Sequence, residues 1–323
     1  MGKAKASLLL PLILSISCVE QFNVVETSPP AVPREGSGVW VLTTLSPEVW
    51  YVGDSALRVL FAGMWANDLT LYGDTLLITN SGDNDVLLYD LSAGSLDTLY
   101  VGAGRNPWAT AYDPRTGRIF VSNFLSNTVS VFEGRGQVAE IDVGPNPEGM
   151  VVVGDRLYVA CTGYSDGYRS RLYVLSTDSL KVLDSLKFGT NVQVVVSDPE
   201  GDIYAVATGD YSSREGWLFR IRDDGVRDST FVGGSPGDVC VSGDGRMYLV
   251  GWSGRITLYD WASERVIGSY DTGFNLMGCG FKGDTLTVAD FGNDRVLLIN
   301  DSGEVAGAYA VGDGPIDLVP DVR

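Results

Sequence analysis

Histidine is absent from all 323 residues of the sequence. Without it, the chain cannot build a histidine-ligated metal site, an axial-histidine haem, a Ser-His-Asp triad or a Cys-His pair. Basic residues are also scarce, because 23 Lys and Arg face 41 Asp and Glu and leave a formal charge of −18. A surface of that charge repels phosphate groups, so we expect no nucleic-acid partner and no direct binding to an anionic membrane.

The sequence has only four cysteines and little helical periodicity. None of the four cysteines belongs to a Cys-x-x-Cys pair. Cys161, Cys240 and Cys279 each lie in an apolar stretch, so we predict buried small hydrophobes, with one disulfide left open as an alternative. Glycine, by contrast, occurs 40 times, and short apolar runs alternate with Gly, Asp, Asn and Pro. This pattern is typical of all-β sandwiches and propellers.

The amino terminus has the features of an export signal. Lys3 and Lys5 precede an apolar run, residues 6–16, that is too short to span a membrane as a mature helix. The run ends in Ser15-Ile16-Ser17-Cys18, which resembles a bacterial lipobox, although serine stands where that motif usually has leucine.

We therefore expect residues 1–17 to be a lipoprotein signal peptide and Cys18 to carry the lipid. Residues 18–38 are rich in proline and lack periodicity, so we expect a disordered tether. An ordinary secretory signal is the alternative. Either signal places the mature chain outside the cytoplasm, in the periplasm or at the cell surface of a bacterium.

A glycine recurs about every 40 residues through the rest of the chain. The successive intervals are 41, 40, 45, 44, 40 and 39 residues, and the glycines are Gly63, Gly104, Gly144, Gly189, Gly233, Gly273 and Gly312. Each full unit contains four short strand-like segments. Four strands in a period of about 40 to 45 residues predict the blades of a β-propeller.

The repeat also gives the number of blades. The units begin at Ala66, Pro107, Pro147, Val192, Pro236, Leu276 and Pro315. The seventh unit has one strand, residues 316–320, whereas three strand-like segments, 39–43, 49–52 and 56–61, precede the first unit. We therefore predict an all-β, seven-bladed propeller over residues 39–323, whose last blade combines strands from both ends and leaves no open sheet edge.

Four segments of the repeat carry a family resemblance. They are Tyr158-Val-Ala-Cys161, Phe120-Val-Ser-Asn123, residues 78–86 and the Val-Gly-x-x-Pro junction of residues 143–147. These segments resemble the YVTN/YncE-like family of bacterial propeller repeats, with a wider similarity to NHL and SMP-30-like propellers. The resemblance covers nearly the whole mature chain and implies the fold, but such propellers host binding proteins as well as unrelated enzymes.

In a propeller of this type, the loops between successive blades gather on one face, at the mouth of the axial channel. The two residues after each blade start form two rings, and one ring should line this mouth. The first ring is Asn67, Trp108, Glu148, Gln193, Gly237, Met277 and Ile316; the second is Asp68, Ala109, Gly149, Val194, Asp238, Gly278 and Asp317. A register change of one residue exchanges the rings, so the sequence does not choose between them.

The polar members of both rings are candidate binding residues. Hydrogen-bond acceptors would come from Asn67, Asp68, Glu148, Gln193, Asp238 and Asp317, with Trp108 as a stacking surface. We expect no cofactor, although several carboxylates at one opening could bind Ca²⁺ through oxygen ligands. The SMP-30-like resemblance implies such a metal, but the ligand set of those lactonases has no residue-by-residue match here. Solvated turn residues without a ligand are the plain alternative.

Two loops, residues 162–170 and 208–216, are longer than their counterparts in other blades. They carry a candidate recognition patch of residue types that are enriched at binding hot spots. Its members are Tyr164, Tyr168, Arg169, Tyr211 and Arg214, and Trp252 lies in a short loop on the same expected face. Tolerated variation in loop length is the alternative interpretation.

Taken together, these features favour a non-enzymatic lipoprotein of the cell envelope that binds a protein or glycan through its propeller face. We expect a monomer that reaches the membrane only through its lipid, with no catalytic residue set and no metal site. The alternative is a Ca-dependent hydrolase or lactonase of SMP-30-like type acting at the channel mouth through Glu148. A quinone-dependent dehydrogenase is less favoured, because the sequence shows no tryptophan docking repeats.

Overall fold

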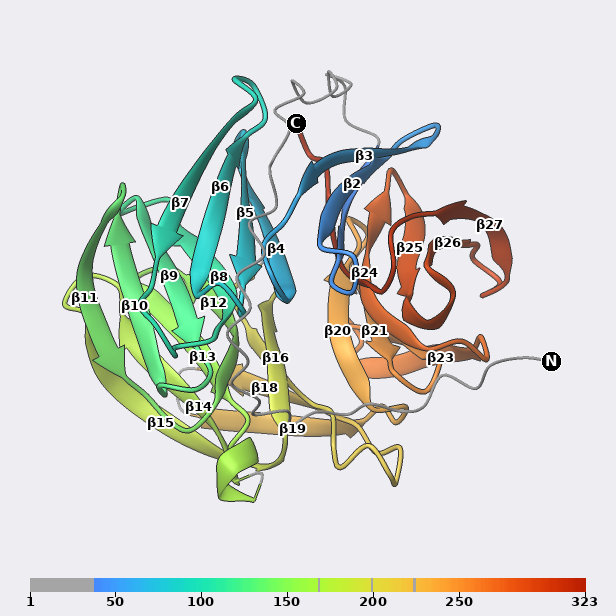
Figure 1. Cartoon of the computed structure of the whole chain (residues 1–323). Helices are drawn as coiled ribbons and strands as arrows, with labels where there is room; N and C mark the ends of the chain where they lie inside the picture. The colour runs from blue at the N-terminus through green and yellow to red at the C-terminus, as the bar shows by residue number, and fades with distance from the viewer. Residues whose placement is uncertain (1–37, 168, 199, 223–224) are drawn as a thin grey trace.

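The structure, a computed structural model, describes residues 38–323 except for residues 168, 199 and 223–224. The expected signal peptide, the lipidation site Cys18, nearly all of the expected tether, and Tyr168 lie outside the described residues. Seven four-stranded antiparallel sheets follow one another around a ring (Figure 1). The seven-bladed propeller predicted from the repeat is confirmed.

Six blades are built from consecutive strands, numbered here from the innermost strand outward. Blade 1 is β4 (Ala66–Tyr72), β5 (Thr75–Asn80), β6 (Asp85–Asp90) and β7 (Ser95–Tyr100); blade 2 is β8 (Pro107–Asp113), β9 (Arg118–Asn123), β10 (Thr128–Glu133) and β11 (Gly136–Asp142). Blade 3 is β12 (Pro147–Val153), β13 (Arg156–Cys161), β14 (Arg169–Ser176) and β15 (Lys181–Thr190); blade 4 is β16 (Val192–Ser197), β17 (Ile203–Ala207), β18 (Trp217–Arg222) and β19 (Gly225–Phe231). Blade 5 is β20 (Pro236–Val241), β21 (Arg246–Gly251), β22 (Arg255–Asp260) and β23 (Arg265–Asp271); blade 6 is β24 (Leu276–Lys282), β25 (Thr285–Asp290), β26 (Arg295–Ile299) and β27 (Val305–Ala310).

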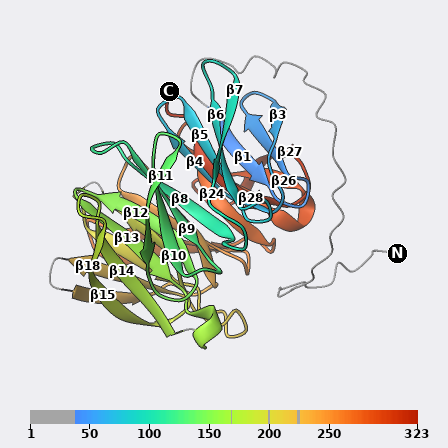
Figure 2. The same cartoon turned by 60° about the vertical axis from the view of Figure 1, so that its left-hand side comes forward.

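Blade 7 combines the two ends of the described chain, as predicted. It contains β28 (Pro315–Pro320), β1 (Val39–Thr43), β2 (Glu48–Val52) and β3 (Ala56–Phe61). Strand β1 pairs antiparallel with β28, and the two strands run side by side in Figure 2. This pairing closes the ring with hydrogen bonds and protects the edge of the innermost strand.

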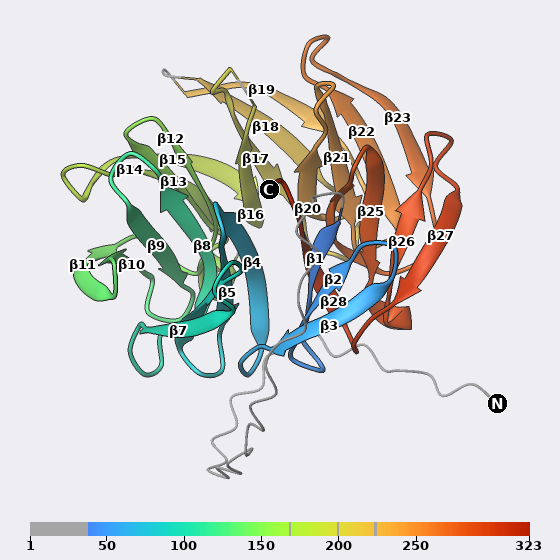
Figure 3. The same ribbon diagram turned by 90° about the horizontal axis from the view of Figure 1, so that it is seen from above.

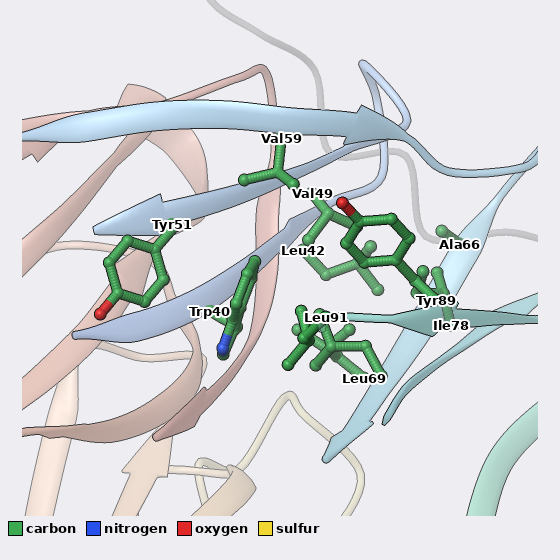
Figure 4. Close-up of a cluster of buried hydrophobic side chains, with 11 residues drawn as sticks. Trp40, Leu42, Val49, Tyr51, Val59, Ala66, Leu69, Ile78, Tyr89 and Leu91 are labelled. Carbon is green, nitrogen blue, oxygen red and sulfur yellow. The ribbon is translucent and has the colours of Figure 1, made fainter. Parts of the chain in front are cut away.

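Both faces of a blade are buried between its neighbours. In β12, Met150 and Val152 pack into the core between blades 2 and 3, while Val151 and Val153 pack into the core between blades 3 and 4. This explains why residues 150–153 of the strand are all apolar instead of alternating. Figure 4 shows the corresponding core at the ring seam, where Trp40 and Leu42 of blade 7 meet residues of blade 1.

The innermost strands surround the axis, as the view in Figure 3 shows. The loops between blades and the loops between the second and third strands of each blade lie at one end of the ring, which we call the loop face. The tight turns of the blades lie at the other end, the turn face. Gly38 is at the turn face, where its carbonyl accepts a hydrogen bond from Asp321 N at 3.0 Å.

Helical structure within the described residues is limited to two 3₁₀ turns, Tyr164–Asp166 and Phe291–Asn293. In this part of the chain, no helix has the length and apolar character needed to cross a membrane.

Candidate recognition face

The loop face is assembled by one backbone hydrogen bond that recurs in all seven blades. The first residue after the second strand donates its N–H to the carbonyl of the residue that precedes the blade start; examples are Phe124 to Asn106 at 2.9 Å and Thr162 to Asn146 at 3.0 Å. The accepting residue has a positive φ at Trp65, Asn106, Asn146, Asn191, Ser235 and Gly314. Asparagine and glycine suit this left-handed conformation, and tryptophan does not.

A β-bulge at the start of the innermost strands separates the two predicted rings. The pairing register shifts between Ala66 and Asp68, between Pro147 and Met150, and at the equivalent positions of the other full blades. A bulge breaks the strict alternation of side chains. The first and second ring residues therefore have different environments and do not simply exchange faces.

Polar first-ring side chains face the loop of their own blade. Asn67 Nδ2 donates to Ser81 Oγ. Gln193 Oε1 accepts from Thr208 Oγ1 at 2.7 Å, and Gln193 Nε2 donates to the Tyr211 hydroxyl at 2.7 Å. Trp108 stacks on Phe124 with ring centroids 5.0 Å apart. These contacts place the first ring at the loop face.

The second-ring carboxylates bind the next blade. Asp68 Oδ2 accepts from Thr110 N at 3.0 Å, and Asp238 Oδ2 accepts from Cys279 N at 2.7 Å. Asp317 Oδ2 accepts in the same way from Leu69 N at 2.7 Å. The three carboxylates belong to blades 1, 5 and 7, and each one ties two innermost strands together.

Burial raises the pKa values of these three carboxyls, and repulsion by other carboxylates adds to the rise for Asp68 and Asp317. Desolvation is the main cause in each case, and it brings the pKa of Asp68 and of Asp238 to about 6. The pKa of Asp317 lies well above its usual value, because the negative charges of Asp68 and Asp238 add to the desolvation. Because each carboxylate bonds the innermost strand of the next blade, the second ring lies where the innermost strands meet around the axis.

Glu148 is a first-ring residue that is almost fully enclosed. Its exposed fraction is 6%, and desolvation raises the pKa of its carboxyl to about 8 despite a hydrogen bond with the Thr162 side chain. The carboxyl is therefore mainly protonated at neutral pH. At neutral pH it therefore offers no charged ligand to the channel mouth, and its enclosure limits access to the carboxyl.

The rings do not form a metal centre in the described part of the chain. No group of three or more Cys, Asp or Glu side chains lies close enough together to hold a metal ion. The Oδ2 atoms of the three axial aspartates are already used by backbone N–H groups of the next blade. A Ca²⁺ ion needs six to eight oxygen ligands, and these contacts compete with that demand.

Aromatic side chains form two groups on the loop face. Beyond the Trp108–Phe124 stack, the Phe124 ring lies 6.5 Å from that of Tyr164, which is 43% exposed. On the far side of the ring, Trp252 lies 5.7 Å from Phe291. Trp108 and Trp252 thus stand next to other aromatic rings, in a part of the surface that is half-buried.

The remaining members of the predicted patch lie in the two long loops. Arg169 is exposed, with its guanidinium 3.6 Å from Asp166, and Arg214 is also exposed. Tyr211 and Arg214 have positive φ values of 62° and 53°. The contacts join Tyr164 to blade 2 and Tyr211 to Gln193 of its own blade.

Sequence reasoning missed one part of this face, the loop between blades 7 and 1. Three of its apolar side chains are more than half exposed: Phe61 by 60%, Met64 by 53% and Trp65 by 57%. Leu45 and Leu125, in neighbouring loops, are exposed by 59% and 61%. A signal for this was available, because tryptophan occupies the slot in which four other units carry asparagine.

The pocket between blades 5 and 6 lies away from these residues. It opens near the turn face, is lined by Arg246, Tyr270 and Asp301 among others, and has a volume of about 50 Å³. That volume holds water but not a metabolite, since ligand pockets are typically about 300 to 1,000 Å³.

The chain is similar to several solved propellers but matches no known family profile and no curated protein sequence. Hydrazine synthase from Kuenenia stuttgartiensis superposes with a TM-score of 0.66 at 19% identity, covering 79% of this chain and 89% of that one. Streptogramin B lyase gives a TM-score of 0.65 at 12% identity, covering 89% and 93%.

A third structure is a catalytically inactive histidine-to-alanine variant of virginiamycin B lyase from Staphylococcus aureus, with quinupristin. It superposes with a TM-score of 0.63 at 12% identity and covers 84% of this chain and 88% of that one. Identities this low carry the fold and not the activity. Together with the closed ring of seven four-stranded sheets, these structural similarities place the chain among the seven-bladed β-propellers.

Proposed function

We propose that this protein is a non-enzymatic binding protein of the bacterial cell envelope, anchored by a lipid on Cys18 and belonging to the YVTN/YncE-like propellers. Its loop face binds a protein or glycan partner. The observation that carries the proposal is the exposure of large apolar and aromatic side chains on this face, from blades 7, 1, 2 and 3. Exposed apolar surface of this kind marks interaction sites.

The position of the chain's ends supports the same assignment. Gly38, the first described residue, lies at the turn face beside Asp321. A lipid anchor that precedes Gly38 therefore joins the propeller at the face opposite the loops. The loop face is then free to meet a partner in the periplasm or outside the cell.

The chemistry of the face supports binding rather than catalysis. The chain has no histidine, so it lacks the residue type whose loss inactivates the virginiamycin B lyase variant described above. Glu148 is buried, with 6% of its surface exposed, so its carboxyl has little access to a ligand. The axial aspartates bind backbone N–H groups, which leaves them to stabilise the ring. No observation on the described residues favours the Ca-dependent hydrolase.

Two experiments test the proposal. For the anchor, metabolic labelling with an alkyne palmitate should mark the wild type and not Cys18→Ser, and equal labelling of both would contradict lipidation. For the binding face, the Trp108→Ala, Tyr164→Ala and Arg169→Ala triple variant should lose partners that co-purify from envelope extracts. An Ala93→Asp variant, at an exposed turn-face position, is the control. Loss of partners only in the control would refute the loop face as the binding face.

A further inference from the structure

The loop between blades 7 and 1 is the most apolar exposed segment on the loop face. Within five consecutive residues, Phe61, Met64 and Trp65 are each more than half exposed. The corresponding segment before blade 3, Gly144-Pro145-Asn146, carries no large apolar side chain. Burial of an apolar side chain of this size stabilises a folded protein, so solvent exposure of three such groups calls for a physical reason.

The backbone of this loop is held rigidly by both neighbouring blades. Ala62 N donates to Pro47 O at 2.8 Å, and Gly63 N donates to Asn80 Oδ1 at 2.9 Å. Met64 N donates to Asp83 Oδ2 at 2.6 Å. In return, the carbonyls of Met64 and Trp65 accept from Gly82 N and Ser81 N at 2.9 and 3.1 Å. A loop fixed by five hydrogen bonds loses little conformational freedom when a partner binds.

The loop is closely packed against blade 1, and Trp65 has an unfavourable backbone conformation. A Cβ on Gly63 would lie 2.4 Å from Asn80, and a Cβ on Gly82 would lie 2.7 Å from Met64. Trp65 has a φ of +52°, a left-handed conformation that is unfavourable for a bulky residue. Strain of this kind persists where the surrounding structure enforces it, and it is concentrated at functional sites.

The charges around the loop point to a basic partner. Asp83 borders Met64, and Asp313 is exposed in the adjoining loop beside Leu45 and Ser46. One nearby cation, Arg58, is paired with Glu48 at 3.0 Å and lies 4.7 Å from the Phe61 ring centroid. The whole chain carries a formal charge of −18. Phe61, Met64 and Leu45 present apolar surface, which an apolar side chain of a protein partner covers without leaving a buried polar group unpaired.

We propose that the loop Phe61–Trp65, with Leu45, docks a protein segment in which an apolar side chain is flanked by Lys or Arg. This inference rests on the proposed binding function and names the class of its partner. The apolar side chain of the partner covers Met64 and Trp65. Its basic residues lie over Asp83 and Asp313, which speeds encounter and aligns the segment.

The test uses the full mature chain with Cys18→Ser, immobilised through a carboxy-terminal tag at the turn face. A phage library of random dodecapeptides is selected on it, and the affinities of enriched peptides are compared with those for Trp65→Asn. Asparagine suits the left-handed conformation, so this variant should keep or raise the melting temperature. Leu96→Asn, which replaces an equally exposed residue on β7, is the control.

The proposal expects enriched peptides with net positive charge and an apolar residue. Their binding should weaken at least tenfold in Trp65→Asn and with rising salt, and remain unchanged in Leu96→Asn. Peptides that bind Trp65→Asn as tightly as the wild type, or that are acidic, would overturn the docking loop but leave the binding function standing.

Three other outcomes would also overturn the docking proposal. Binding to a glycan array that depends on Trp108, without any enriched peptide, would leave the binding function with a glycan partner. Sedimentation with phosphatidylcholine vesicles, abolished by Trp65→Asn, would make the loop a membrane contact. A homodimer dispersed by Trp65→Asn in light scattering would make it a self-association surface. Failure of peptides and glycans alike would count against both proposals.

Discussion

Asp317 and Leu69 are joined across the seam at which the propeller closes, where Asp317 Oδ2 accepts the backbone hydrogen bond of Leu69 at 2.7 Å. Two sets of hydrogen bonds therefore close the ring, since β28 also pairs with β1 within blade 7. Equivalent bonds join Asp68 to Thr110 and Asp238 to Cys279. The axial aspartates are best understood as connectors between blades.

Removing the seam carboxyl should destabilise the fold. Asp317→Ala leaves the Leu69 N–H without an acceptor, and we expect the free energy of unfolding to fall by about 1–3 kcal/mol. Asp317→Asn keeps an oxygen in the same place and should lose less than half as much. Thermal unfolding at pH 5 measures both, and equal losses in the two variants would contradict the connector role.

The wild-type protein should become less stable as the pH rises from 5 to 8. The folded-state pKa values of Asp68, Asp238, Asp317 and Glu148 are raised, so the folded chain binds more protons than the unfolded chain in this window. The stabilisation that these protonated groups contribute is fully present below about pH 4, the range of the unfolded pKa values. It is lost as the pH rises through their folded-state pKa values. Carboxyls with lowered pKa values, such as Asp210 at about 2, change the stability only at pH values below 5. A melting temperature that rises from pH 5 to 8 would refute this account.

Glu148→Gln separates the buried glutamate from the axial aspartates. The substitution removes a charge that the folded state tolerates poorly, because the pKa of Glu148 is raised to about 8. Relative to wild type, the variant should gain stability between pH 5 and 8.5, by about 4 kcal/mol at the upper end, since the pKa rises from 4.5 to about 8 and one pKa unit corresponds to about 1.4 kcal/mol. Denaturant titrations at both pH values measure this gain. If the difference in unfolding free energy between the variant and the wild type did not change with pH, Glu148 would have the same pKa in the folded and unfolded states, which contradicts the prediction.

The three cysteines of the propeller should be inert in the native state. Cys161, Cys240 and Cys279 are buried and unpaired, and desolvation raises the pKa of each thiol, to about 12 for Cys161. Thiolates are the reactive form, so we expect no labelling by Ellman's reagent before unfolding and three thiols after it, in a Cys18→Ser background. Fewer than three thiols after unfolding would reveal a disulfide.

Much of the fold could be predicted from the sequence, because the junctions repeat a local rule. The innermost strands begin at Ala66, Pro107, Pro147 and the other predicted blade starts. Proline suits a strand's first residue, and asparagine suits the left-handed residue before it. The seventh blade followed from counting, since three strands at one end complement the one strand at the other.

The roles of the two rings could not be predicted, for a physical reason. The bulges near Asn67–Asp68 and Glu148–Gly149 interrupt the alternation on which such assignments depend. The burial of Glu148 was also hidden, because it depends on tertiary packing, in which the carboxyl lies beside the Thr162 side chain. The exposed residues 61–65 were missed because they continue the apolar pattern of β3, which ends at Phe61. The one visible signal was Trp65, which stands where four other units have asparagine.

The central claim is that partners meet the loop face and not the turn face. Site-specific photo-crosslinking in living bacteria tests it most directly, with a benzophenone amino acid at Leu125 on the loop face or at Ala93 on the turn face. Both positions are exposed. The account predicts a discrete crosslinked adduct from position 125 and none from position 93. Adducts from position 93 alone would contradict it.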